Sequence, residues 1–196
     1  MNGQPTPRIG PLPFEQWDPK TRDVYSAAMK TPVLGELSNK PLLNVLATLA
    51  NNGWLFTIAI PFQSAISAGQ IPARERELAT LRTAYQTRST YEWSQHYTLA
   101  QKAGVTETEI QHVAQGPDAP GWSAIDAALL QAVDQINANA NIDEPTWQTL
   151  ATRYDRNQLL ELMYLVGSFR MLATLLNACQ VPLEDWQPVR PFPGAA

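Results

Sequence analysis

The stretch from Glu77 to His96 carries the side chains with the clearest capacity for chemistry. Eleven residues separate Glu77 from Ser89, two separate Ser89 from Glu92, and three separate Glu92 from His96. Carboxylates and an imidazole that converge can transfer protons at a reacting carbon, which typically contributes about 10²–10⁴ in rate. These residue types therefore indicate acid–base catalysis: removal of a proton next to a carbonyl, or protonation of the dienolate that remains when CO2 departs.

Two consecutive helices are expected to position these groups. On the second, predicted from Tyr91 to Ala103, Trp93, His96 and Tyr97 recur at helical spacing and mark a buried stripe. His96 therefore faces inward. Glu92 lies one turn before His96 and projects beside it.

The first of the two helices is predicted from Pro72 to about Arg88, with Glu77 at the edge of its apolar face, one turn before Leu81. Two antiparallel helices joined by a short turn can bring Glu77 across from His96. We therefore expect Glu77, Glu92 and His96 to meet at the wall of an apolar pocket. His96 would be the general base or acid, and the two carboxylates would orient it.

Each of these residues also has a purely structural interpretation, and the sequence leaves both open. Ser89 and Glu92 form the pattern of a capping box, in which Glu92 only satisfies backbone donors at the helix start. Glu77 lies in a charged run, residues 74–82, that could form solvent-exposed ion pairs. An inward histidine such as His96 can be a hydrogen-bonded core residue. With these roles the protein would be a non-catalytic binding or assembly protein on the same scaffold.

The same stretch resembles the active-site segment of the alkylhydroperoxidase D and carboxymuconolactone decarboxylase family, whose peroxidase pattern is Glu-x11-Cys-x2-Cys-x3-His. Ser89 and Glu92 stand at the two thiol positions here. The resemblance runs from about Leu42 to Leu183. Over this range the chain is similar to the thiol-free branch of the family. Its best-matching blocks are residues 74–82, 91–96, 100–106, 166–172 and 175–177.

The resemblance implies an all-α, AhpD-like domain built around a helical hairpin. It also implies a homo-oligomer, a trimer or hexamer with a dimer as the alternative, and pockets near subunit contacts. The implied activity is that of a cofactor-independent lyase or isomerase on a small carboxylated or lactone-type substrate. His96 matches the family histidine and Glu77 the upstream glutamate, whereas the missing thiols argue against peroxidase activity.

Residues beside the acid–base group could bind the substrate. Tyr91, Trp93 and Arg88 are predicted to line or guard a pocket for a planar acid. Core packing of Trp93 and solvent exposure of Arg88 are the competing interpretations, and the sequence does not decide between them.

Composition argues against several other classes. A formal net charge of −4 provides no basic surface for nucleic acid. The histidines are His96 and His112 and the single cysteine is Cys179, so we expect no metal centre and no internal disulfide. The first residues show no signal peptide, and the apolar run from Leu159 to Leu176 contains charges, which favours a buried helix over a membrane span. We therefore predict a cytoplasmic protein without membrane partner or cofactor.

Apolar residues recur at helical spacing along nearly the whole chain, and no convincing alternating strand is present. We predict an extended N-terminal arm over residues 1–14, one domain over residues 15–181 and a proline-rich arm over residues 182–196. The arms could be disordered or could latch onto neighbouring subunits. Helices are expected at about residues 18–29, 41–52, 54–68, 72–88, 91–103, 106–114 and 123–140, with two more starting near residues 143 and 155.

Overall fold

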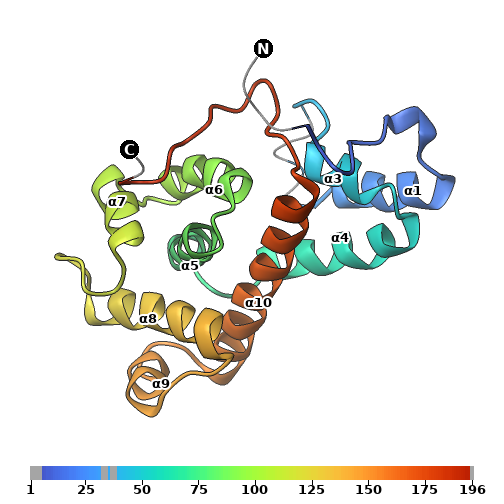
Figure 1. The fold of residues 1–196 in the computed structure, drawn as a ribbon. Helices are drawn as coiled ribbons and strands as arrows, with labels where there is room; N and C mark the ends of the chain where they lie inside the picture. Colours follow the sequence, from blue (N-terminus) through green and yellow to red (C-terminus); the bar gives the residue numbers. More distant parts are fainter. Residues whose placement is uncertain (1–5, 32–34, 36–38, 195–196) are drawn as a thin grey trace. The chain divides into compact units, whose positions relative to one another are not determined.

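The chain folds into helices and connecting loops. A computed structural model describes residues 6–31, 35 and 39–194, and no β-strand occurs among them. The predicted all-α class is therefore confirmed. The helices are η1 (Phe14–Gln16), α1 (Pro19–Ala28), α3 (Asn44–Leu49), α4 (Gly53–Ser67), α5 (Ala73–Gln86), α6 (Thr90–Lys102), α7 (Glu107–Gln115), α8 (Ala124–Asn139), α9 (Glu144–Ala151) and α10 (Arg156–Cys179) (Figure 1).

Contacts within the chain group the described residues into two compact units. The first comprises residues up to Gly69 together with Leu176–Trp186, and the second comprises Gln70–Leu175 together with residues from Gln187 onward. The acid–base candidates all lie in the second unit. The predicted boundaries of the arms and the domain remain predictions, and residues 1–5 and 195–196 of those arms lie outside the described residues.

Side-chain caps start several helices where the sequence predicts them. Asp18, Ser123 and Asp143 each accept a hydrogen bond from the backbone N–H three residues later. Thr106 and Glu109 form the reciprocal capping box. Each cap satisfies a donor that the first helical turn leaves unpaired, which typically stabilises a helix by about 1 kcal/mol.

Two helix starts in the first unit differ from expectation. α3 begins at Asn44 rather than three residues earlier, because the Glu184 carboxylate accepts from Asn44 N at 2.7 Å and supplies the cap from 140 residues away. Gly53 begins α4 instead of interrupting a helix, since the Asn52 side chain accepts from Leu55 N. α4 then packs against α1 and α3.

In the second unit, α5 is the central helix and packs against α6, α7 and α8, while α8 also packs against α9 (Figure 1). Every residue of α5 from position 77 to position 84 is buried. A helix covered on every side hides polar residues too, so Glu77 and Arg82 need interior partners. Arg82 donates to Asp134 of α8 at 2.6 Å, and to the carbonyls of Val113 and Ala114 in the last turn of α7.

α10 is only partly covered. Among the described residues it is the one helix long and apolar enough to cross a membrane, and 44% of its most apolar window is buried. Leu162 and Leu165 are almost fully buried, whereas Leu160 and Met171 are more than half exposed. The helix predicted to be buried is thus buried on one side.

The C-terminal arm packs on α6 of the same unit. Arg190 N donates to Ser94 Oγ at 3.0 Å, and Gln187 Nε2 donates to Ser94 O at 2.8 Å. The Phe192 and Trp93 rings lie 5.4 Å apart between centroids. These contacts tie the arm to α6 of its own chain.

Candidate active site

Glu77 and His96 form a hydrogen-bonded pair across the α5–α6 hairpin. His96 Nδ1 and Glu77 Oε2 are 2.7 Å apart, and their side chains are 16% and 5% exposed. The helices meet in this way because only residues 87–89 join them, and Arg88 turns the chain in the left-handed conformation, with φ of 54°. When Glu77 is ionised, Nδ1 carries the proton that it donates, and Nε2 is left to exchange protons.

Two further residues hold this pair, and the sequence did not reveal either role. Phe169 of α10 packs edge-on against the imidazole, with ring centroids 5.0 Å apart and an interplanar angle of 90°. Arg76 Nε lies 3.5 Å from Glu77 Oε1. Phe169 lies in residues 166–172, one of the blocks that resemble the family. That resemblance was the one clue in the sequence that Phe169 belongs to the site. Apolar spacing indicates that a residue is buried, but it does not identify the side chain that the residue contacts.

Glu92 is buried without a partner for its carboxyl group. The residue is 2% exposed, and neither carboxyl oxygen makes a hydrogen bond of acceptable geometry to a described residue. Burial raises the pKa of Glu92 to about 8, and the nearby Ser89 hydroxyl opposes this rise only in part. At neutral pH the group is therefore mostly protonated and can donate a proton.

The capping role that the sequence left open for Glu92 is filled without its side chain. Ser89 Oγ accepts from Glu92 N at 3.4 Å at the start of α6. Ser89 N itself donates to Ala84 O at 2.9 Å. The reciprocal half of a capping box is therefore absent, and capping does not explain the buried Glu92 carboxyl group.

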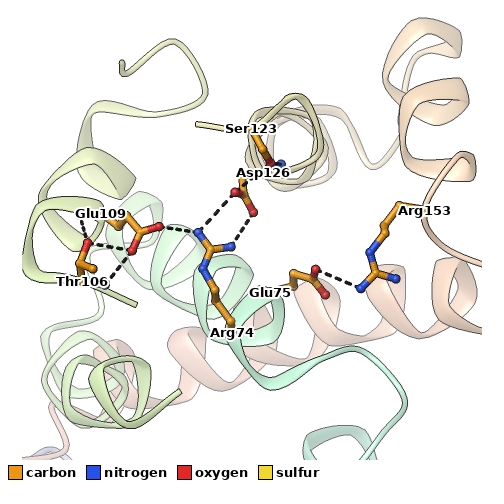
Figure 2. Close-up of polar contacts among 7 residues, drawn as sticks. All are labelled: Arg74, Glu75, Thr106, Glu109, Ser123, Asp126 and Arg153. Atoms are coloured by element: carbon orange, nitrogen blue, oxygen red, sulfur yellow. Dashed lines mark hydrogen bonds and ion pairs between the residues drawn. The ribbon is translucent and has the colours of Figure 1, made fainter. Parts of the chain in front are cut away.

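The charged run at the start of α5 is tied to other elements (Figure 2). Arg74 donates to Glu109 of α7 and, at 2.8 Å, to Asp126 of α8. Glu75 pairs at 3.4 Å with Arg153, which precedes α10. These pairs hold the turn of α5 that leads to Glu77. An exposed ion-pair face does not describe Glu77 itself, which is buried.

The three substrate-binding candidates occupy different surroundings. Tyr91 is 7% exposed. Trp93 has no exposed surface, and its ring packs among those of Tyr85, Tyr97 and Phe192. Arg88 is exposed, and its guanidinium lies over the ring of Tyr85 at 4.9 Å. Trp93 could therefore contact a substrate only if the C-terminal arm moved.

Other reactive groups do not join this set. No cluster of three or more His, Cys, Asp or Glu side chains within the described residues is arranged to hold a metal ion. His112 stacks edge-on against Trp122, and Cys179 belongs to the first unit. Among the described residues, the second unit thus holds the hydrogen-bonded Glu77–His96 pair and, one turn before His96 on α6, the buried Glu92 carboxyl group.

Comparisons with known proteins agree with this fold. Residues 59–135, which include Glu77, Glu92 and His96, match the Carboxymuconolactone decarboxylase family. None of the curated proteins matches the sequence.

Several solved structures share the fold at low sequence identity. An uncharacterized peroxidase-related protein from Silicibacter sp. TM1040 has a TM-score of 0.73 and 14% identity, over 99% of this chain and 98% of that one. The alkylhydroperoxidase AhpD core of a peroxidase-related protein from Ralstonia eutropha JMP134 has a TM-score of 0.71 and 15% identity, over 90% and 93% of the two chains. A variant of the debrominase Bmp8 in complex with 2,3,4-tribromopyrrole has a TM-score of 0.70 and 18% identity, over 90% and 91%. At these identities the similarity concerns the fold alone.

Proposed function

We propose that the chain is an acid–base enzyme of the carboxymuconolactone decarboxylase type, on the basis of the match of residues 59–135 to the Carboxymuconolactone decarboxylase family. Its substrate is a small carboxylated or lactone-type compound, and its reaction is a decarboxylation or an isomerisation. The observation that carries the proposal is the buried set of groups: a Glu77–His96 hydrogen bond of 2.7 Å, with the protonated Glu92 one turn away on α6.

In an isomerisation, His96 Nε2 removes a proton from the carbon next to a carbonyl group. The electron pair of the broken C–H bond moves to the carbonyl oxygen and forms a dienolate. The Glu92 carboxyl group donates its proton to the far end of the dienolate, and the His96 imidazolium then returns a proton to Glu92. Glu77 remains a carboxylate throughout and stabilises the imidazolium, as an adjacent carboxylate does in other acid–base sites.

In a decarboxylation, the bond between the substrate and its carboxylate carbon breaks and CO2 departs. The electron pair is delocalised into the neighbouring carbonyl group as a dienolate. Glu92 supplies the proton that replaces CO2, and solvent restores the proton on Glu92. Burial of the acid favours this order, because it keeps a proton on the Glu92 carboxyl group at neutral pH.

The size of the substrate is inferred from a protein of the same fold. The debrominase Bmp8 binds 2,3,4-tribromopyrrole, which is a small planar ring, and this supports a small cyclic substrate here. Tyr91 is our first candidate for substrate contact, while Trp93 and Arg88 could take part once the C-terminal arm is displaced. We further propose that the enzyme works in the cytoplasm, since its single cysteine suits a reducing compartment. We also propose that it is a homo-oligomer and needs no cofactor, as the family resemblance implies.

The decisive test uses the two histidines of the chain. Wild type, His96→Gln and His112→Gln are incubated in D2O with a panel of small lactone carboxylates and unsaturated acids, and NMR follows deuterium incorporation and product. His96→Gln should lower turnover by at least about 10²-fold, because general acid–base catalysis contributes that much. His112→Gln, the matched control, should keep full activity.

Circular dichroism spectra of both variants serve as the control for correct folding. Full activity of His96→Gln would exclude the proposed mechanism. If wild type turns over no member of the panel, and His96→Gln lowers only thermal stability, the residues form a structural network and the protein is the alternative, a binding or assembly protein.

A further inference from the structure

The guanidinium of Arg76, on α5, makes no hydrogen bond to any residue that the structure describes. Its one polar contact there is with Glu77, at 3.5 Å between Nε and Oε1. The other arginines of the same helix differ, because Arg74 and Arg82 are each held by carboxylates of other helices. The two Nη groups of Arg76 can therefore form the paired hydrogen bonds that a guanidinium makes with a carboxylate.

Arg76 lies beside the acid–base pair and is its most accessible neighbour. One oxygen of the Glu77 carboxylate faces Arg76 Nε, and the other lies 2.7 Å from His96 Nδ1. The Arg76 side chain is 21% exposed, whereas that of Glu77 is 5% exposed. A small molecule whose carboxylate is bound by Arg76 would therefore have its remaining atoms close to His96.

Thr80 provides a second unused donor on the same helix. It lies one turn after Arg76, so the two residues share a face of α5. Thr80 is 1% exposed, and its Oγ1 has no hydrogen-bond partner among the described residues. The hydroxyls of Thr83 and Thr87 instead donate to the carbonyl four residues earlier. A buried hydroxyl without a partner is unfavourable, so Thr80 Oγ1 lacks an acceptor that a ligand could supply.

Glu92 of α6 faces the side of the hairpin on which Thr80 lies. The two residues are at the same level, since each is one turn from the hydrogen-bonded acid–base pair, toward the turn of the hairpin. Successive helix residues point about 100° apart, so Glu92 and Trp93 face different sides. Trp93 contacts Tyr85, which is about 140° around α5 from Thr80. The unpartnered groups of Thr80 and Glu92 thus converge on the side away from Trp93.

We propose that Arg76 and Thr80 bind a small acid that carries both a carboxylate and a carbonyl group. The Nη groups of Arg76 pair with the carboxylate, and Thr80 Oγ1 donates to the carbonyl oxygen. One guanidinium balances one negative charge, and a neutral hydroxyl suits a carbonyl better than a second anion. The ligand is therefore an oxo acid or a lactone acid with a single carboxylate.

This inference deepens the proposed function and rests on it for its catalytic meaning. A carbonyl held by Thr80 places the adjacent C–H bond between the two helices that carry His96 and Glu92. The carboxylate on Arg76 fixes the other end of the molecule. Arg76 and Thr80 are thus substrate-binding residues, while proton transfer stays with the acid–base groups.

NMR titration of the full chain with three probes of matched size tests the proposal. Levulinate has a carboxylate and a ketone, levulinamide lacks the charge, and pentanoate lacks the ketone. Wild type should bind levulinate at least about tenfold more tightly than levulinamide, because hydrogen bonds to charged groups are the stronger ones. It should prefer levulinate over pentanoate by about two- to tenfold, the effect of one neutral hydrogen bond.

The variants assign each preference to its residue. Arg76→Gln should abolish the preference for levulinate over levulinamide, and Arg76→Lys should keep part of it. Arg156→Gln, at an exposed arginine that begins α10, is the matched control and should keep all of it. Thr80→Val should abolish the preference for levulinate over pentanoate, whereas Thr80→Ser, which retains the hydroxyl, should bind like wild type.

The proposal is wrong if either preference is absent from wild type or survives in the corresponding variant. A residue that only supports the fold would weaken the binding of all three probes alike, which would also contradict it. Circular dichroism spectra show whether each variant is folded. Binding is measured without turnover, so a protein that binds the probes as expected but catalyses no reaction would refute the proposed function and leave this binding site standing.

Discussion

At the scale of single residues, burial of the Glu92 carboxyl group has a direct energetic consequence. An unpaired carboxylate is costly to bury, so the group retains its proton instead of its charge. With a pKa of about 8 it is neutral where an exposed glutamate is ionised. This state leaves Glu92, one turn before His96 on α6, with a proton that it can donate, and it also makes the stability of the fold depend on pH.

Glu92→Gln should remove part of that pH dependence. The folded state holds a proton on Glu92 up to about pH 8, whereas the unfolded chain loses it near the ordinary glutamate pKa of 4.5. The free energy of unfolding of wild type should therefore fall as pH rises between these values, by about 1.4 kcal/mol per unit at most from this group. Glutamine does not titrate, so the variant should gain stability relative to wild type as pH rises.

Urea unfolding at several pH values across that window measures the difference. Glu144→Gln, at an exposed glutamate of α9, is the matched control and should follow wild type throughout. A constant difference between Glu92→Gln and wild type at every pH would mean that Glu92 is not protonated in the fold.

At the scale of elements, the buried Arg82 side chain joins three helices of the second unit. It pairs with Asp134 of α8 and donates to carbonyls at the end of α7, where a cation also suits the helix dipole. α7 ends at Gly116, whose φ of 104° and ψ of −164° are accessible almost only to glycine. The Cβ of any other residue at Gly116 would lie 2.9 Å from Arg82 Nη2. Arg82 cannot move aside without losing these bonds.

Gly116→Ala should therefore destabilise the protein more than Gly104→Ala does. Gly104 also has a positive φ, of 90°, but no heavy atom lies within 4 Å of its Cβ position. Backbone strain should lower the free energy of unfolding of Gly104→Ala by about 1–2 kcal/mol. The loss should be larger for Gly116→Ala, because the new Cβ also collides with Arg82. Thermal and urea unfolding of the two variants give the comparison. Equal losses would mean that Arg82 adapts at no cost.

At the scale of the whole molecule, the chain leaves the second unit after Leu175, contributes Leu176–Trp186 to the first unit and then returns. The returning arm packs against Trp93, which has no exposed surface. Phe192 contacts the rings of both Trp93 and Tyr85. The last residues of the chain thus complete the packing around the candidate site.

Phe192→Ala should loosen this cover. Loss of a partly buried aromatic ring should lower the free energy of unfolding by about 1–3 kcal/mol. Water that reaches Trp93 should shift tryptophan emission to longer wavelength. Val189→Ala, in the same arm but 57% exposed, should stay within about 0.5 kcal/mol of wild type. Unchanged emission and stability in Phe192→Ala would show that the arm adds nothing to the fold.

The sequence by itself determined the features that depend on near neighbours in the chain. Asp18, Thr106 and Asp143 start helices as predicted, because a cap acts on backbone groups only three residues away. The approach of Glu77 to His96 followed from the same local logic, since His96 is only 19 positions further along the chain, after one tight turn. Periodicity and caps therefore sufficed for most helix starts and for the approach of Glu77 to His96.

Only the tertiary structure decided the features that depend on burial by distant segments. Phe169 reaches His96 from α10, and Glu184 caps α3 from the far end of the chain. The protonation of Glu92 depends on which side chains exclude water from it. Local sequence specifies hydrogen bonds along the chain, whereas solvation is set by the whole surroundings of a group, and the chemistry of this site depends on solvation.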